Sequence, residues 1–286
     1  MCRLFGMTGG AEPVEATFWL LQAPDSLSEQ SRREPDGTGL GWFGDDGRPH
    51  VCKQPLAAHG DRTFAREARR VRSRTFVAHV RYATTGALEP RNTHPFEQEG
   101  RLLAHNGMVA DLDELERELG AARRLVHGAT DSERVFALIT REIARLGDVG
   151  EGIASAARWI AANLRMLAIN LVLIEPDGLW ALRYPDVHEL FVLRRDAGGR
   201  DGAAALDHAR GGRIRATSEQ LAERAAVVVA TEPMDDDPGW RPLASGELAH
   251  VDAGLAVDSR QVLAHPPTRP LTLDELEGRA ASAQRA

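Results

Sequence analysis

Apolar residues recur along the chain with two different spacings, and each spacing predicts a different kind of element. Alternating or continuous apolar runs predict strands at residues 3–7, 39–43, 75–82, 102–105, 168–174, 179–183, 189–193 and 226–230. Helical spacing predicts helices at residues 14–22, 113–119, 131–146 and 149–164. A parallel βαβ repeat would alternate strictly, whereas here two consecutive helices separate two groups of strands. The order therefore favours an α+β fold with antiparallel sheets.

The segments between these elements predict one domain rather than two. The chain shows no internal repeat and no linker between domains, although its length would allow two small domains. Residues 196–212 are rich in glycine, alanine and charged residues, which is typical of a surface loop. From residue 265 the sequence HPPTRP leads into a short polar tail, which we expect to lie away from any chemistry.

The composition narrows the class of protein and its partners. A net charge of −7 argues against nucleic acid or an anionic membrane surface as the main partner. The N-terminus lacks the pattern of a secretory signal, and the longest apolar run, residues 168–174, is too short to span a bilayer. Because there are only two cysteines, Cys2 and Cys52, we expect no disulfide framework and a reducing, cytoplasmic location.

A cysteine directly after the initiator methionine is the first candidate for chemistry. Methionine aminopeptidase removes Met1 when the next side chain is small, which would leave Cys2 with a thiol and a free α-amine. The unperturbed pKa of an α-amine is about 7.7–8.0, so part of it is neutral near pH 7 and can act as a base. Such a base activates the nucleophilic thiol. Considered alone, however, position 2 is more simply explained as a tolerated small residue.

Two segments could place further groups beside Cys2. PDGTGLGWF, residues 35–43, is a glycine-rich turn before a strand, but it lacks the GxGxxG spacing and the following helix of a phosphate-binding loop. HVRYATTG, residues 79–86, contains a strand that delivers Arg81 to a turn. A guanidinium can bind a carboxylate through two hydrogen bonds, although an arginine at a strand end more often forms a surface ion pair.

Two later segments carry an amide and a carboxylate. In LLAHNGMV, residues 102–109, Asn106 and Gly107 form either a simple turn or an oxyanion hole made of a side-chain amide and a backbone N–H. In GATDSERV, residues 128–135, the simplest explanation of Asp131 is a cap of the following helix.

The chain contains six motifs, MCRLFG, PDGTGLGW, HVRYATTG, NTHPF, AHNG and TDSE, whose order resembles the glutaminase domain of class II glutamine amidotransferases. The similarity continues through residues 227–248. No single motif is specific, but six in register behind an N-terminal cysteine form a strong signal. The resemblance implies an Ntn-hydrolase four-layer αββα sandwich with two antiparallel sheets over residues 2–256, and a polar C-terminal extension at 257–286.

The resemblance also implies the reaction and its catalytic residues. Cys2 would attack the side-chain amide of glutamine and form a γ-glutamyl thioester, with its own α-amine as the general base. Asn106 and Gly107 would stabilise the tetrahedral oxyanion. Water would then hydrolyse the thioester, so that ammonia and glutamate are released.

Further positions that match the family's motifs would bind the substrate. Arg81 would hold the α-carboxylate and Asp131 the α-ammonium group, which suits a zwitterionic amino acid. Thr84 and Gly86 would line the same pocket. The resemblance also assigns His94, in the retained NTHPF motif, to substrate binding.

The chain departs from the family pattern at Tyr82 and Thr85, where better-known members carry tryptophan and histidine. The loss of that histidine disfavours efficient coupling to a synthase. The chain is most similar to the short stand-alone bacterial members, so ammonia transfer would need a separate synthase subunit. Two alternatives remain open: hydrolysis of another γ-glutamyl metabolite, as in the ergothioneine pathway, and a non-catalytic subunit that binds glutamine or a partner.

We expect neither a metal nor a cofactor. The candidate metal ligands match no zinc-site spacing. These candidates are Cys2, His94, His105 and Asp131.

Overall fold

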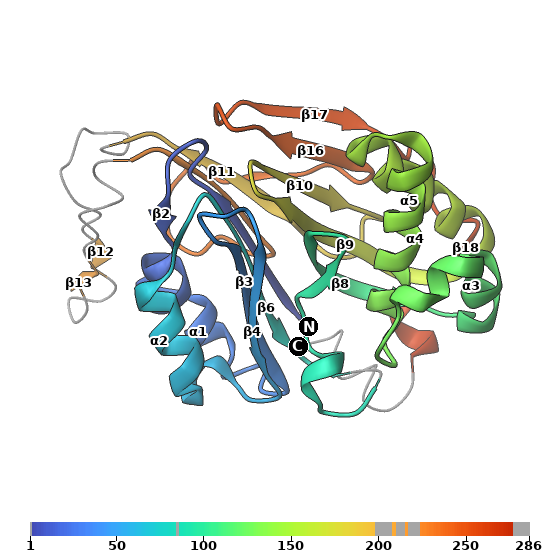
Figure 1. Cartoon of the computed structure of the whole chain (residues 1–286), viewed down its shortest axis with the longest axis horizontal. Helices are drawn as coiled ribbons and strands as arrows, with labels where there is room; N and C mark the ends of the chain where they lie inside the picture. Colours follow the sequence, from blue (N-terminus) through green and yellow to red (C-terminus); the bar gives the residue numbers. More distant parts are fainter. Residues whose placement is uncertain (1, 84–85, 198–207, 210–214, 217–223, 277–286) are drawn as a thin grey trace.

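Two seven-stranded sheets lie face to face, and helices cover the outer face of each (Figure 1). The computed structural model describes residues 2–83, 86–197, 208–209, 215–216 and 224–276. The predicted αββα sandwich with two antiparallel sheets is confirmed by this arrangement.

The first sheet has β1 near its centre, so the N-terminal segment begins inside the molecule. All six residues of β1 are buried, because the strand has neighbours on both edges and a packed layer on both faces. The strands in spatial order are β15 (Arg241–Pro242), β11 (Phe191–Arg195), β14 (Ala226–Ala230), β1 (Arg3–Thr8), β6 (Thr75–Arg81), β3 (Gly37–Phe43) and β4 (Pro49–Gln54). Every adjacent pair is antiparallel.

The second sheet faces the first and is also antiparallel along its main path. Its strands in spatial order are β17 (Val257–Gln261), β16 (Glu247–Val251), β10 (Gly178–Arg183), β9 (Arg165–Glu175), β8 (Arg101–Val109) and β7 (Phe96–Gln98). β18 (Arg269–Pro270) joins β9 in parallel. Because β16 and β17 are paired, the boundary that we predict at residue 256 falls inside a β-hairpin.

Helices, short turns and two small ladders complete the fold. The α-helices are α1 (Leu27–Gln30), α2 (Arg62–Arg70), α3 (Leu112–Leu119), α4 (Asp131–Leu146) and α5 (Val149–Asn163). A π-helical turn spans Phe18–Gln22, and 3₁₀ turns span Ala58–Gly60, Pro90–Asn92, Gly120–Leu125 and Leu273–Glu275. Two small two-stranded ladders pair β2 (Val14–Glu15) with β5 (Arg72–Ser73) and β12 (His208–Ala209) with β13 (Arg215–Ala216).

The helix predicted at residues 14–22 is wrong over its first half. Val14 and Glu15 pair with β5 as a short strand, and only Phe18–Gln22 is helical. Phe18, Trp19 and Leu20 are all buried, whereas Gln22 at the end of the turn is exposed. The surface loop predicted at 196–212 lies mostly outside the described residues, although β12 falls within it.

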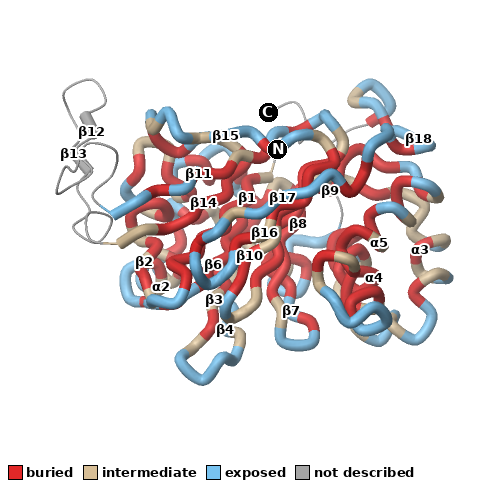
Figure 2. The backbone as a smooth tube through the Cα atoms, turned by 90° about the horizontal axis from the view of Figure 1, so that it is seen from above, coloured by how far each residue is buried: buried red, intermediate tan, exposed pale blue. Residues whose placement is uncertain are grey.

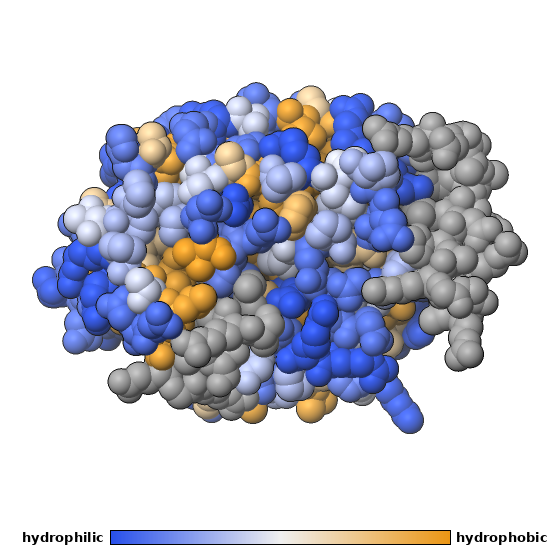
Figure 3. All heavy atoms as spheres, turned by 180° about the vertical axis from the view of Figure 1, so that it is seen from behind, coloured by the Kyte–Doolittle hydropathy of each residue, from blue (hydrophilic) through white to orange (hydrophobic). Residues whose placement is uncertain are grey.

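Three large apolar clusters hold the layers together. One fills the space between the sheets and includes Leu4, Val77, Leu102 and Val172. A second lies between the first sheet and the helices α1 and α2, and a third lies between the second sheet and α3, α4 and α5. Buried residues accordingly follow the central strands, and exposed ones follow the connecting loops (Figure 2). The face drawn in Figure 3 is mostly hydrophilic, with apolar side chains gathered in a few patches.

Candidate active site

Cys2 immediately precedes β1, at the end of the first sheet where β6 finishes. The Sγ atom of Cys2 accepts a hydrogen bond from the backbone N–H of Tyr82 at 3.3 Å and lies 3.5 Å from the carbonyl oxygen of Tyr82. Tyr82 directly follows Arg81, the last residue of β6. The pairing of β1 with β6 therefore brings the candidate nucleophile and the candidate carboxylate-binding residue to the same edge of the sheet.

The environment of Cys2 keeps its thiol protonated at neutral pH. Although the residue as a whole is half-buried, its thiol is surrounded by protein, and this desolvation raises the pKa of the Cys2 thiol to about 11, while the hydrogen bond with the Tyr82 backbone acts in the opposite direction. A thiol with so high a pKa needs a base close by before it can act as a nucleophile. Activation of this thiol would therefore require a proton acceptor next to Cys2.

A buried ion pair lies beside the nucleophile, and our sequence analysis missed it. Glu34 is completely buried, and its Oε1 lies 3.4 Å from Nη1 of Arg3. Arg3 also donates from Nε to Glu232 at 2.9 Å, so two carboxylates from distant segments hold the residue next to Cys2. Burial raises the pKa of Glu34, and the charge of Glu34 in turn contributes to the raised pKa of Cys2.

Arg81 holds the turn that follows β6. Its guanidinium donates to the carbonyl oxygens of Ala87 at 3.2 Å and Gly86 at 3.4 Å. Gly86 has a φ of +72°, which favours glycine. The structure thus brings Arg81 and Gly86 into contact with each other, whereas Thr84 and Thr85 lie outside the described residues.

Asn106 and Gly107 lie on β8, in the sheet opposite Cys2. β1 and β6 face β8 and β9 across the interior. Asn106 is fully buried, and neither polar atom of its amide has a hydrogen-bond partner among the described residues. At Gly107 an added Cβ would lie 1.9 Å from the carbonyl oxygen of Ala168, so only glycine fits there. A glycine and an unpaired amide side by side are suited to binding an oxyanion.

Asp131 is the first residue of α4, but it is not the helix cap. The cap is Thr130, whose side chain accepts a hydrogen bond from the N–H of Glu133 at 3.3 Å. The Oδ2 atom of Asp131 accepts a hydrogen bond from the N–H of Val109 at 2.9 Å. This contact fastens the carboxylate to β8, two residues beyond Gly107.

Three histidines are buried near these residues. The rings of His79 and His94 lie 4.2 Å apart, and His94 also contacts the ring of Phe96 at 4.6 Å. Nδ1 of His105 lies 2.9 Å from Oγ of Ser132. Burial lowers the pKa of all three, to about 3 for His79. The assignment of His94 to substrate binding stays a prediction.

The buried histidines should make the fold sensitive to acid. Their pKa is lower in the folded than in the unfolded state, so their contribution to stability is present above pH 6.5 and decreases as the pH falls toward the folded value. For His79 we expect the free energy of unfolding to fall by about 1.4 kcal/mol for each pH unit below 6.5. Denaturant unfolding from pH 7 to 4.5 measures this slope.

The matched comparison uses His79→Gln and His127→Gln, of which the second changes an exposed histidine. His79→Gln should reduce the slope of the unfolding free energy against pH by the contribution of about one proton, which is about 1.4 kcal/mol per pH unit. His127→Gln should leave this slope nearly unchanged. Equal slopes in the two variants would contradict the prediction.

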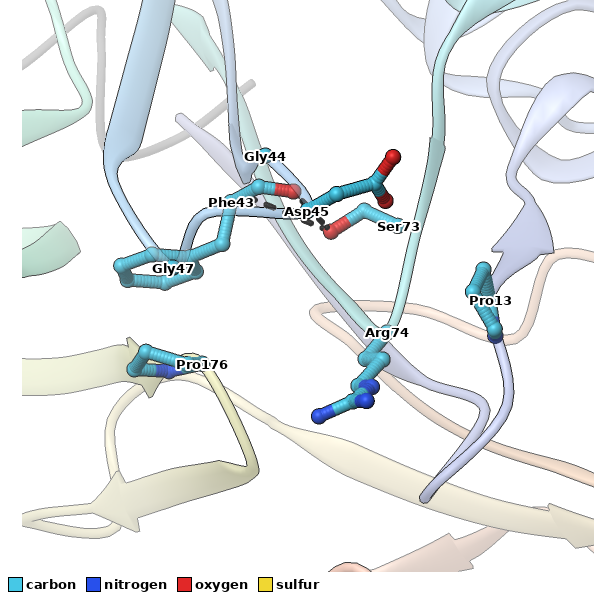
Figure 4. A pocket seen from close by; sticks show the side chains of 8 residues that line it. All are labelled: Pro13, Phe43, Gly44, Asp45, Gly47, Ser73, Arg74 and Pro176. Atoms are coloured by element: carbon cyan, nitrogen blue, oxygen red, sulfur yellow. Dashed lines mark hydrogen bonds between the residues drawn. The ribbon is translucent and has the colours of Figure 1, made fainter.

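A separate cavity of about 180 Å³ lies at the other end of the sheets (Figure 4). β1 runs away from Cys2 toward Gly9, whose N–H donates to the carbonyl oxygen of Arg74 in the cavity wall. Arg74 forms an ion pair with Asp177 at 2.6 Å. The lining residues are Pro13, Phe43, Gly44, Asp45, Gly47, Ser73, Arg74 and Pro176. None of the predicted site residues belongs to this cavity.

Among the described residues, no group of three or more histidine, cysteine, aspartate or glutamate side chains could hold a metal ion. Within the same part of the chain, no helix has the length and apolar character needed to cross a membrane.

Comparison with known proteins tests the resemblance noted in the sequence. The family model described as glutamine amidotransferases class-II matches residues 1–271. The chain belongs to this family. A γ-glutamyl-hercynylcysteine sulfoxide hydrolase from Mycolicibacterium smegmatis is 30% identical over 90% of this chain and 99% of that protein. "Probable glutamine amidotransferase DUG3" from Saccharomyces cerevisiae is 25% identical over 93% of this chain and 84% of that protein.

Solved structures of class II glutamine amidotransferases share the fold. Glutamine phosphoribosylpyrophosphate amidotransferase from B. subtilis superimposes with a TM-score of 0.63 at 20% identity, over 93% of this chain and 50% of that chain. Membership of the family makes this chain an enzyme of the glutamine amidotransferase and amidohydrolase type, with cleavage of a glutamine-type amide as its reaction class.

Proposed function

We propose that Cys2 is the nucleophile of this enzyme and that it cleaves the side-chain amide of glutamine, or of a γ-glutamyl amide, through a γ-glutamyl thioester. The observation that carries the proposal is the contact of the Cys2 thiol with the Tyr82 backbone, next to Arg81. Tyr82 directly follows Arg81, and the charge of Arg81 opposes the burial that raises the pKa of the Cys2 thiol, which supports a role for this guanidinium in binding the substrate's α-carboxylate.

The reaction begins with a proton transfer within Cys2. After Met1 is removed, the free α-amine of Cys2 takes the proton from the thiol and acts as the general base. The thiolate attacks the amide carbon, and the resulting oxyanion is held by the Asn106 amide and the Gly107 N–H. The intermediate collapses as the ammonium of Cys2 gives its proton to the leaving nitrogen. The C–N bond breaks, and ammonia or an amine departs.

Water completes the cycle. The α-amine, again neutral, accepts a proton from a water molecule as the water oxygen attacks the thioester carbon. The C–S bond then breaks, the thiolate regains its proton from the ammonium, and glutamate leaves. No redox step and no metal is involved in this sequence.

The two ends of the substrate need opposite charges from the protein. We propose that Arg81 binds the α-carboxylate and that Asp131 binds the α-ammonium group, while Thr84, Gly86 and His94 line the pocket. The burial of Arg81 and Asp131 supports these roles, because charge pairing is strongest where water is excluded. Asp131 is fixed by the N–H of Val109, so its carboxylate has a defined position.

A γ-glutamyl amide with a larger leaving group is the second candidate substrate. The name of the Mycolicibacterium relative, which acts on a γ-glutamyl compound and matches this chain over 99% of its own length, favours it.

Where the nitrogen is transferred rather than released, we propose that a separate synthase subunit supplies the acceptor. Both cysteines are free, which suits the reducing cytoplasm proposed as the location.

A substrate panel tests the proposal. Full-length protein with a free N-terminal Cys2, checked by intact mass, is incubated with glutamine and with γ-glutamyl amides of increasing leaving-group size. Release of glutamate is then measured. Turnover of glutamine with stoichiometric ammonia supports the glutaminase reaction, and preference for a larger amide supports the second substrate class. Absence of glutamate release from every member would contradict both.

A further inference from the structure

The segment that follows β17 returns to the second sheet close to the candidate oxyanion hole. Arg269 and Pro270 pair with Arg165 and Met166 at the start of β9. The N–H of Leu271 then donates to the carbonyl oxygen of Met166 at 2.8 Å. Met166 is also the residue that β9 pairs with Val109, two positions beyond Gly107. One residue of β9 therefore joins residues 269–271 to the end of β8.

Apolar packing strengthens this connection. Leu271 and Leu276 are buried together with Leu167, and Met108 packs against the same cluster. Met108 directly follows Gly107, and the pairing of β8 with β9 is interrupted by a bulge between Met108 and Val109. A bulge leaves local backbone less constrained by the ladder, so side-chain packing has more influence on its geometry.

An ion-pair cluster fixes the same corner. Asp111 lies just beyond β8 with a φ of 57°, in the left-handed region. Its carboxylate accepts hydrogen bonds from the backbone N–H and Nε of Arg165, and it lies 3.3 Å from Nη1 of Arg269. These contacts tie the segment, β9 and the end of β8 to one another at the surface, where Arg165 and Arg269 are exposed and Asp111 is half-buried.

We propose that residues 269–276 form a brace that positions Asn106 and Gly107 for oxyanion binding, with Leu271 and Leu276 as the positioning residues. The proposal rests on the oxyanion role proposed above for those two residues. An oxyanion donor that moves by a fraction of an ångström loses much of its effect, because its hydrogen bond must reach the position where charge develops. The tail that the sequence predicts to be remote from chemistry thus contributes to it through Met108.

The test compares two leucine-to-alanine substitutions at buried positions of the full-length protein. Leu271→Ala removes a brace contact, while Leu263→Ala changes a leucine that is equally buried, 8% exposed against 7%, but packs in the cluster beneath α4 and α5. The midpoint temperature of thermal unfolding should fall by similar amounts in both variants. Below the unfolding range, Leu271→Ala should lower kcat about 10-fold or more with little change in KM, and Leu263→Ala should leave kcat within about twofold.

Two further measurements distinguish a positioning effect from a loss of stability. Hydrogen exchange of the peptide that contains residues 104–110 should become faster in Leu271→Ala than in Leu263→Ala. The rate at which iodoacetamide alkylates Cys2 should be the same in both variants, since that reaction needs no oxyanion hole.

The proposal of a brace is contradicted if the two variants have equal kcat, or if hydrogen exchange at residues 104–110 does not differ between them. Because hydrogen exchange is measured without a substrate, a brace that holds β8 would still be detected if the unaltered protein hydrolysed none of the amides tested. Failure of the unaltered protein to hydrolyse any of the amides would instead contradict the proposed function.

Discussion

Replacement of Cys2 by alanine is expected to lower the rate of amide hydrolysis by about 10⁴-fold to 10⁶-fold, the range seen when a covalent nucleophile is removed from a hydrolase. The reason is that no other described nucleophile shares the position of Cys2 against the Tyr82 backbone. The folded structure should persist, because Cys2 is only half-buried and precedes the first strand. Glutamate release from the best substrate of the panel measures the effect.

Cys52→Ala is the matched control for this variant. Cys52 is the other cysteine, is also free and half-buried, and lies on β4 opposite Leu40 rather than at the end of β6. We expect Cys52→Ala to keep its activity and to lose it when iodoacetamide alkylates Cys2. Full activity in Cys2→Ala, or equal losses in the two variants, would show that the nucleophile lies elsewhere.

Retention of Met1 should lower the rate of amide hydrolysis almost as much as loss of the Cys2 thiol. A preparation that retains Met1 keeps the Cys2 thiol but has no free α-amine on that residue, so the proposed base is lost. Removal of a general base typically costs about 10²-fold to 10⁴-fold in rate. Intact-mass analysis of each preparation, set against its specific activity, would reveal this dependence.

The strands predicted from continuous apolar runs are found because full burial requires such runs. β1, β6, β9 and β14 lie inside the sandwich, so both of their faces contact protein and the residues between their ends are mostly apolar. α2 was missed because only Phe64 and Ala68 are buried on it, and its remaining residues are mostly arginine. One apolar side chain per turn is too weak a pattern to distinguish a short helix from a loop.

The site could be predicted only as a set of separate motifs. Cys2 and Arg81 are distant in sequence, and only the pairing of β1 with β6 makes them neighbours. The ion pair between Arg3 and Glu34 left no signal, because a charged residue in a sequence does not reveal whether it is buried or which partner it meets. Long-range contacts of this kind depend on strand register, which the apolar pattern alone does not specify for a buried strand.

Asn106→Ala should separate activity from stability. We expect kcat to fall by about 10²-fold to 10³-fold, because the variant loses one donor to the oxyanion. The free energy of unfolding should fall little or even rise, although the side chain is fully buried, because no described residue gives its amide a hydrogen bond. A buried polar group without partners opposes folding, so its removal offsets the loss of packing.

Asn170 provides the matched control, because it pairs with Asn106 across β8 and β9 and is also fully buried. Its amide is satisfied: Nδ2 donates to the carbonyl oxygen of His188 at 3.1 Å, and Oδ1 accepts from the N–H of Tyr184 at 2.9 Å. Asn170→Ala should therefore lower the free energy of unfolding by about 1–3 kcal/mol, through the partners it leaves unpaired. Its effect on kcat should be far smaller than that of Asn106→Ala. If Asn106→Ala were the less stable of the two, or kept its kcat, the amide of Asn106 would be a structural group rather than an oxyanion donor.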